Sequence, residues 1–305
     1  MSTVPQTVVR PEFEADSLGE ASHGDVARKL TLWEKLTDMD GVRKLSILIA
    51  LMFAWELYAT GMELSNIYDR PDLILPKFSA VAEALYESLV YDQLTTMIWN
   101  SIRLLVTGYV IGLGIATVLT TVAITTRFGS DVLSTLTAML NPLPAIALLP
   151  LALIWFGLGP SSIVFTLLHS VIWPVALNAH TGFMSVSDTQ RMVGRNYGLR
   201  GLEYVAKLLI PAAFPSILTG LKVGWAYAWR TLIAAELYFG GGVADTAGTQ
   251  SGGLGWFVFA AQNELQIATS YAGLFTIILV GVFVESVIFS NIEARTVRRW
   301  GMQQS

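Results

Sequence analysis

The sequence has no cysteine and few charged residues. Zero cysteines exclude a disulfide framework, thiolate catalysis and metal sites built on cysteine. Charged residues make up 14% of the 305 residues and hydrophobic residues 53%, whereas an ordinary soluble domain is roughly 25% charged. The net charge of −4 offers no basic excess for nucleic acid. This composition argues against a soluble protein and indicates a polytopic membrane protein.

Catalytic and nucleotide-binding signatures are missing as well. Of the three histidines, His169 and His180 lie in one apolar segment, and neither belongs to a ligand motif. A lone histidine in such a segment is more typical of packing than of metal binding. The glycine-rich segment 239–266 lacks the Gly-Lys-Ser/Thr of a phosphate-binding loop. The sequence therefore predicts no catalytic residue, no metal site, no cofactor and no enzyme activity.

Long apolar segments dominate the chain instead. About 20 apolar residues in a helix cross roughly 30 Å of hydrocarbon. Six segments qualify or nearly qualify, at residues 45–60, 102–125, 132–156, 162–183, 212–238 and 271–292. The predicted fold class is therefore an all-α membrane protein with six transmembrane helices. The predicted domains are a charged N-terminal tail (1–44), a transmembrane domain (45–292) and a C-terminal tail (293–305).

Lysine and arginine are unevenly distributed along the chain. If the spans alternate from an inside N-terminus, 14 of the 19 Lys and Arg residues lie inside, two outside and three within spans. Because cytoplasmic segments carry the positive excess, both termini are predicted to be cytoplasmic. The tail begins without the apolar core of a signal peptide. Its segment 26–39 has one apolar helical face, which fits either a membrane-surface helix or a solvated one.

Two outer segments differ in kind. Segment 69–100 repeats Val81, Leu85 and Leu89 at four-residue spacing, which predicts an amphipathic helix at the outer surface. Segment 239–266 is predicted to be a glycine-rich outer loop.

Glycine and proline distinguish two of the spans. The pair Gly108 and Gly112 predicts close approach of another helix. Segment 132–156 contains Pro144 and Pro150, and prolines bend helices because they lack a backbone donor. Either this is a bent packing helix or it lines a pathway, where a cavity satisfies the freed carbonyls. We favour the pathway.

Charges within the spans need partners or water, since each costs about 2.5–3.5 kcal/mol near the centre of a membrane helix. Arg230 lies deep in segment 212–238. It either makes a pathway electropositive and suited to anions, or forms an ion pair with Glu236 or Glu285. Arg103 and Lys222 lie nearer span ends, so we expect them to extend toward the interface in structural roles.

The loop 188–211 carries the strongest local signal. Gly198 can end a short helix in the left-handed conformation, and a second helix then runs to Pro211, which suits the first turn of the next span. We call this helix–turn–helix the elbow. An exposed, basic and structured elbow between two spans predicts a docking surface for a cytoplasmic partner.

The elbow resembles the EAA loop of ABC-importer permeases, whose pattern is Glu-Ala-Ala, three residues, Gly, nine residues and Ile-x-Leu-Pro. Met192, Val193 and Gly194 stand where Glu-Ala-Ala would be, so the usual acidic residue is a methionine here. The resemblance implies a coupling loop formed by Met192, Val193, Gly194, Arg195, Gly198, Leu208, Ile210 and Pro211.

From about residue 70 the chain is similar to the nitrate/sulfonate/taurine/bicarbonate branch of these permeases. The matching segments are Ser101-x-Arg103 with Gly108, 141–159, 218–221, 229–236 and 253–256. Because Trp229 and Glu236 belong to them, the candidate pathway residues become Pro144, Pro150, Trp229, Arg230 and Glu236.

The resemblance implies a type I importer in a bacterial inner membrane. Two permease copies would form the pore, two cytoplasmic ATPase subunits would dock on the elbows, and a periplasmic or lipid-anchored binding protein would deliver a small anion or organic acid. Membrane lipid would surround the spans, with no role for nucleic acid. Alternatives are the same machine for a thiamine precursor, a flavin or another small solute, and a stand-alone secondary carrier.

Overall fold

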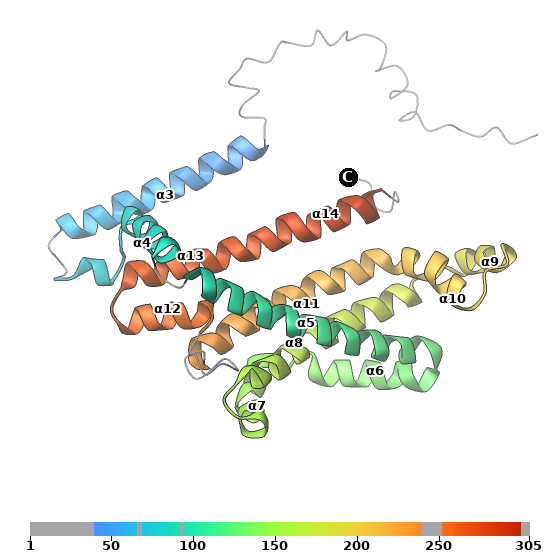
Figure 1. Cartoon of the computed structure of the whole chain (residues 1–305). Coiled ribbons are helices and arrows are strands. Elements are labelled where there is room, and N and C mark those ends of the chain that lie inside the picture. The colour runs from blue at the N-terminus through green and yellow to red at the C-terminus, as the bar shows by residue number, and fades with distance from the viewer. Residues whose placement is uncertain (1–39, 66, 68, 92–93, 240–251, 300–305) are drawn as a thin grey trace, which may run out of the picture. The chain divides into compact units, whose positions relative to one another are not determined.

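The computed structural model describes residues 40–299 except 66, 68, 92–93 and 240–251. Within these residues every regular element is helical, as predicted (Figure 1). The α-helices are α3 (Asp40–Leu64), α4 (Phe78–Val90), α5 (Leu94–Thr125), α6 (Arg127–Leu140), α7 (Leu149–Phe156), α8 (Pro160–Met184), α9 (Asp188–Asn196), α10 (Gly201–Tyr204), α11 (Ile210–Phe239), α12 (Leu254–Asn263), α13 (Ile267–Phe283) and α14 (Ser290–Glu293). Short 3-10 turns η1 (Pro71–Leu73) and η2 (Ala145–Leu148) and π-helical turns η3 (Val205–Leu209), η5 (Val284–Phe289) and η6 (Ala294–Arg298) adjoin them.

The chain divides into two compact units, Met1–Trp55 and Glu56–Ser305, with the division inside α3. In the first unit the structure describes only the N-terminal part of α3. The charged tail before it, including the predicted surface helix 26–39, lies outside the described residues. All further description concerns the second unit, apart from the length of α3.

Five of the six predicted spans are single helical segments long and apolar enough to cross a membrane. Their observed bounds are Gly41–Leu64, Leu94–Thr125, Pro160–Met184, Val205–Phe239 and Ile267–Val297. The membrane-spanning architecture is therefore confirmed, and each of these helices is longer than its apolar segment indicated.

The third predicted span, 132–156, is not one helix. Helix α6 ends at Leu140, and the segment Ala145–Phe156 continues at an angle of 88° to it. Because Pro142 and Pro144 have no backbone N–H, the helical hydrogen-bond ladder cannot continue through them, and Pro144 is extended (ψ 121°). With 14 residues, α6 is about 21 Å long and shorter than the hydrocarbon core. The pair is a broken span or a re-entrant segment.

Helix α8 is the centre of the second unit, and it packs against both α5 and α11 (Figure 1). Glycine permits the close approach on the α5 side. A Cβ on Gly108 would lie 2.9 Å from Leu167 Cβ, and one on Gly112 would lie 2.8 Å from Val171 Cβ. Both distances are shorter than a real side chain tolerates, so the predicted Gly108/Gly112 packing face is confirmed.

The two segments that were predicted to lie outside contain helices that pack on α13. The predicted helix is present as α4, but its buried face differs from the predicted one: Val81 and Ser88 are buried, and Leu89 is exposed. Segment 239–266 is not a loop throughout. Its residues 240–251 lie outside the described ones, but α12 follows, and Leu254, Phe257, Val258 and Ala261 bury one face of that helix at helical spacing.

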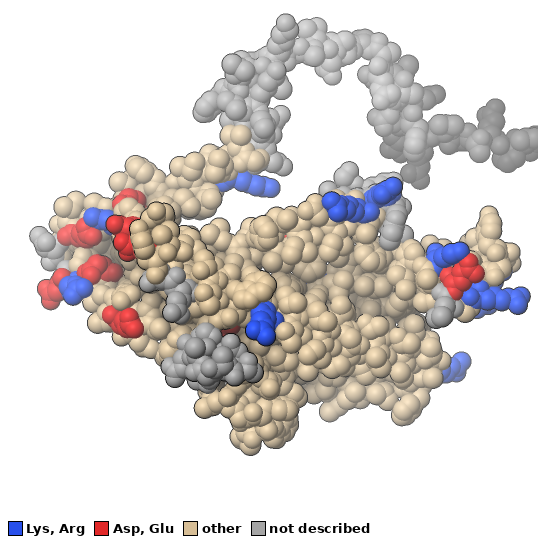
Figure 2. Space-filling model, viewed as in Figure 1, with Lys and Arg blue, Asp and Glu red and all other residues tan. Residues whose placement is uncertain are grey.

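The connections gather at two ends of the second unit. The α5–α6 turn, the helices α9 and α10, and α14 lie toward one end, and α4 and α12 toward the other (Figure 1). Charged side chains gather at these ends, and the surface between them is almost entirely uncharged on the visible face (Figure 2). This distribution is typical of a helical bundle whose middle part lies in hydrocarbon.

Candidate functional site

The first half of the elbow is a short helix with both ends capped. At its start, Ser187 and Gln190 form a capping box, in which the Gln190 N–H donates to Ser187 Oγ and the Ser187 N–H donates to Gln190 Oε1, both at 3.3 Å. At its end, the Gly198 N–H donates to the Arg195 carbonyl (2.9 Å) and the Leu199 N–H to the Gly194 carbonyl (3.1 Å). This is a Schellman motif, and Gly198 adopts φ +76°, which confirms the left-handed turn predicted there.

The second half of the elbow runs into the next span without a break. Helix α10, η3 and α11 form one continuous helical run from Gly201 to Phe239. Pro211 lies in the first turn of α11, as predicted, but the preceding helix does not end there. The Ile210 N–H pairs with the Val205 carbonyl, five residues back, so the turn before Pro211 is π-helical. The helix continues through Pro211 although this residue has no N–H to donate.

Contacts hold the elbow against the ends of the two spans that it connects. Arg191 donates from its guanidinium to the Phe183 carbonyl (2.7 Å) and the Val186 carbonyl (3.1 Å), which ties α9 to the end of α8. Gly194 is buried, and a Cβ there would lie 3.0 Å from Leu208 Cδ2. The two arms of the elbow therefore pack on each other and form a stiff unit.

The outward face of the elbow is apolar and basic. Met192 is 57% exposed and Tyr197 83% exposed, and Val193, Arg195 and Ile210 are exposed as well. Of the residues predicted for the coupling loop, Gly194, Gly198, Leu208 and Pro211 shape the elbow, and the other four present its surface.

A cavity of about 360 Å³ lies where three segments meet. Its walls come from the α6–η2 connection, the middle of α8 and the second half of α11. Two predicted pathway residues, Pro144 and Arg230, line it from different segments. The other lining residues are Asn141, Pro142, Leu143, Ala145, Ile146, His169, Ser170, Trp173, Pro174, Tyr227, Thr231 and Ala234. Sequence reasoning did not single out Trp173, Tyr227 or Asn141 as site residues.

The other three candidate pathway residues do not line this cavity. Pro150 is exposed in the first turn of α7. Trp229 is nearly buried, and its indole Nε1 lies close to Gly281, where a Cβ would be 3.4 Å away. Glu236 is buried among α5, α11 and α12.

Glu236 makes hydrogen bonds that the spacing of residues in the sequence could not predict. The Ser101 hydroxyl lies 2.8 Å from both carboxyl oxygens, and the Gly255 N–H donates to Oε2 at 3.0 Å. Ser101 Oγ in turn accepts from the Leu254 N–H at 2.8 Å. Gly253 also packs directly on the carboxyl group. We call Ser101, Glu236 and the start of α12 the buried carboxyl network; it joins three helices.

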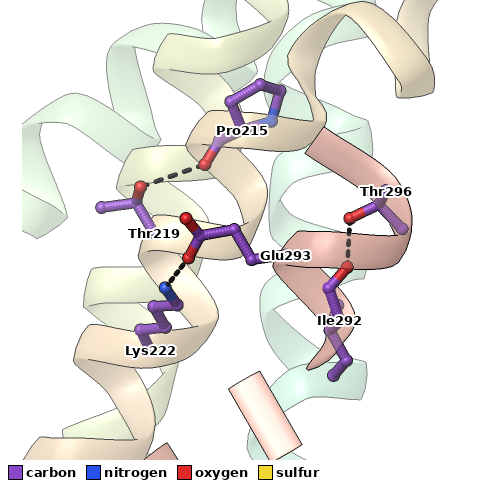
Figure 3. A network of polar contacts seen from close by, with 6 residues as sticks. All are labelled: Pro215, Thr219, Lys222, Ile292, Glu293 and Thr296. Carbon is purple, nitrogen blue, oxygen red and sulfur yellow. Dashed lines mark hydrogen bonds and ion pairs between the residues drawn. The ribbon is translucent and has the colours of Figure 1, made fainter. Parts of the chain in front are cut away.

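The basic residues within the spans differ in their partners. Among the described residues Arg230 has no ion pair, and Glu236, one of its two expected partners, is engaged in the buried carboxyl network. Lys222 forms an ion pair with Glu293 of α14 (Figure 3). We expected Lys222 to extend toward the interface; the structure shows this partner instead. Arg103 is exposed.

The fold and these features define a class: a multi-pass helical membrane protein of the transport type, with a stiff elbow between two spans and a cavity with polar walls. The chain belongs to the family of binding-protein-dependent transport system inner membrane components, whose family model matches residues 108–298. It is a transport permease and not an enzyme.

Named relatives agree with this assignment. The chain is 25% identical to a nitrate import permease protein of Synechocystis, over 81% of this chain and 86% of the relative. It is 28% identical to the taurine transport system permease protein of Escherichia coli K12, over 78% and 82%. It is 27% identical to a nitrate import permease protein of Leptolyngbya laminosa, over 75% and 80%. The predicted resemblance to ABC-importer permeases of this branch is confirmed.

Proposed function

We propose that this chain is the pore-forming subunit of an ATP-driven importer for a small anion or organic acid. Two copies of the chain form the pore, two separate ATPase subunits dock on the elbows, and a solute-binding protein delivers the substrate. The names of the relatives, which refer to nitrate and taurine, support this substrate class. Arg230 also supports it, because this cation lies at the cavity and pairs with no carboxylate among the described residues, which favours an anion.

The elbow is the observation that carries this proposal. It is capped at both ends of α9, and its second arm is continuous with α11. A push on the elbow therefore moves a helical run of 35 residues, Val205–Phe239, which is about 52 Å long. Arg230 and one wall of the cavity lie on this same run. This continuity supports a mechanical link between a docked ATPase and the pore.

The orientation follows from the same elements. The α5–α6 turn, the elbow and α14 lie toward one end of the second unit (Figure 1), and these connections carry the basic residues Arg127, Arg191, Arg195, Arg200 and Arg295. We assign this end to the cytoplasm of a bacterial inner membrane, with both termini on that side. Residues 1–44 and 293–305 are then cytoplasmic tails of the transmembrane domain 45–292.

A matched pair of tyrosine substitutions tests the docking role. Tyr197 on the elbow and Tyr91 after α4 are 83% and 79% exposed, so aspartate at either position leaves the core intact. We expect Tyr197→Asp to lower the amount of ATPase that co-purifies from native membranes at least tenfold, because an interface residue at a well-packed contact contributes about 2 kcal/mol or more. Tyr91→Asp should leave the co-purified amount unchanged.

Two results would overturn the proposal. One is equal recovery of the ATPase with both variants. The other is a chain that purifies alone and still moves solute into liposomes without ATP, which would establish a secondary carrier. Ligand-induced melting shifts of the cognate binding protein then separate a small anion from a thiamine precursor or a flavin as the substrate.

A further inference from the structure

The cavity between the α6–η2 connection, α8 and α11 has a single permanent charge. Arg230 is its only lysine or arginine, and no aspartate or glutamate is among the described residues that line it. The polar side chains beside it can donate: the Asn141 amide and the hydroxyls of Tyr227, Ser170 and Thr231. This set favours a negatively charged guest over a cationic one.

Two ring nitrogens on the cavity wall have no hydrogen-bond partner. Trp173 Nε1 and His169 Nε2 are buried atoms that no described protein group satisfies. Both residues lie on α8, one helical turn apart, with ring centroids 6.1 Å apart. The indole N–H can only donate, and a buried donor without an acceptor is costly and rare. Because both atoms are closed to solvent, neither contacts a guest in the cavity as the wall stands.

A hydroxyl pair joins two walls of the cavity. Ser170 Oγ of α8 and Thr231 Oγ1 of α11 are 2.9 Å apart. Since each hydroxyl has one hydrogen and only one of them is used between the two, the other remains free to donate. The pair therefore fixes α8 against α11 next to Arg230 and leaves one more donor for a guest.

The position of Arg230 along the span shows that this face does not meet lipid. Arg230 lies nine positions before the end of α11 at Phe239, so its backbone is about 14 Å from that end. An arginine at such depth faces protein or water, and among the described residues it has no ion pair. Water or a dissolved anion is the remaining neighbour.

We propose that this cavity is an anion-binding site of the permease itself, which holds a small oxyanion beside Arg230 and the Ser170–Thr231 hydroxyl pair on its way through the pore. This inference rests on the proposed function and deepens it. The guest is a compact ion with a planar or tetrahedral oxyanion group, such as nitrate or a sulfonate. The 360 Å³ of the cavity corresponds to about 12 water molecules of liquid volume, which suits such an ion with part of its hydration shell.

The arginine pair Arg230 and Arg103 provides the test. Both are exposed arginines within spans, but only Arg230 lines the cavity. The purified full-length chain, with whatever subunits accompany it, is titrated with sodium nitrate, sodium methanesulfonate and, as the cationic probe, choline chloride at constant ionic strength. Thermal melting and tryptophan fluorescence are recorded for the unsubstituted chain, Arg230→Gln, Arg103→Gln and Trp173→Phe.

We expect saturable stabilisation by nitrate or methanesulfonate and none by choline. Arg230→Gln should weaken the apparent affinity roughly 10- to 100-fold, whereas Trp173→Phe, which removes only an N–H that is closed off from the cavity, should bind as the unsubstituted chain does. Arg103→Gln should bind as the unsubstituted chain does. Equal anion effects in both arginine variants, or no saturable anion effect at all, would overturn the site.

Failure of this inference is separable from failure of the proposed function. Co-purification of the ATPase with the unsubstituted chain, measured in the same preparations, depends on the elbow and not on the cavity. An ATPase that co-purifies without any saturable anion effect would remove the site and keep the importer. A chain that binds anions but purifies without an ATPase would keep the site and remove the ATP-driven function.

Discussion

The buried carboxyl network makes a sharp prediction for Ser101→Ala. Ser101 is fully buried and Glu236 is 3% exposed. The hydroxyl donates to the Glu236 carboxyl group and accepts from the Leu254 N–H. Removing it leaves the Leu254 N–H buried without a partner, which costs about 1–3 kcal/mol, and takes one of two donors from the carboxyl group, which costs about 0.5–1.5 kcal/mol. The sum is a loss of roughly 2–4 kcal/mol in the free energy of unfolding.

Two measurements check this value. Unfolding in mixed micelles by increasing SDS, followed by circular dichroism, gives the change in the free energy of unfolding. Hydrogen–deuterium exchange of a peptide that covers α12 reports the local effect, because the Leu254 and Gly255 amides are held by Ser101 and Glu236. We expect faster exchange at the start of α12 in Ser101→Ala, and little change at the elbow, which is at the other end of the second unit.

A surface serine provides the control. Ser134 is exposed, and its hydroxyl bonds only to the Asp131 carbonyl of its own helix, so Ser134→Ala should alter stability by less than about 0.5 kcal/mol. The reasoning would be refuted if both alanine variants lost the same stability, or if exchange in α12 stayed unchanged in Ser101→Ala.

Two further predictions concern the packing of the spans. Gly112→Val places a Cβ 2.8 Å from Val171 Cβ and should cost about 1–3 kcal/mol through overpacking, whereas Gly114→Val on the same helix, with nothing within 4 Å, should be nearly neutral in the same SDS titration. Lys222 and Glu293 form an ion pair between α11 and α14 (Figure 3), so a double-mutant cycle with Lys222→Met and Glu293→Gln should give a coupling energy of at least about 0.5 kcal/mol, and additive effects would contradict a direct interaction.

Residue patterns predicted the structure correctly where it depends on residues close together in the sequence. The left-handed turn at Gly198 could be predicted because only a residue without a Cβ adopts that conformation at little cost. The packing face of Gly108 and Gly112 could be predicted because residues four apart lie on the same side of a helix. In both cases the residues that form the pattern in the sequence also form the structural feature.

Prediction failed where distant segments compete or cooperate. Segment 132–156 is as apolar as a span, but Pro142 and Pro144 interrupt the hydrogen-bond ladder, and the chain turns by 88° instead of bending slightly. Segment 239–266 reads as a glycine-rich loop, yet α12 forms there because its apolar face is buried by α11 and α13. The prolines decide the first case and tertiary burial the second, and a hydropathy average contains neither.

By itself, the sequence determined the membrane class, the six apolar segments and the elbow, since apolar length, turn residues and spacing act within a few residues of one another; only the structure showed that five of these segments are continuous helices and that 132–156 is broken. Only the tertiary structure decided that Arg230 and Pro144 share a cavity with Trp173, and that Glu236 belongs to a buried network with Ser101, 135 positions away. A hydrogen bond or a cavity wall requires atoms to lie within a few ångströms, and that proximity depends on how the helices pack rather than on the order of residues along the chain.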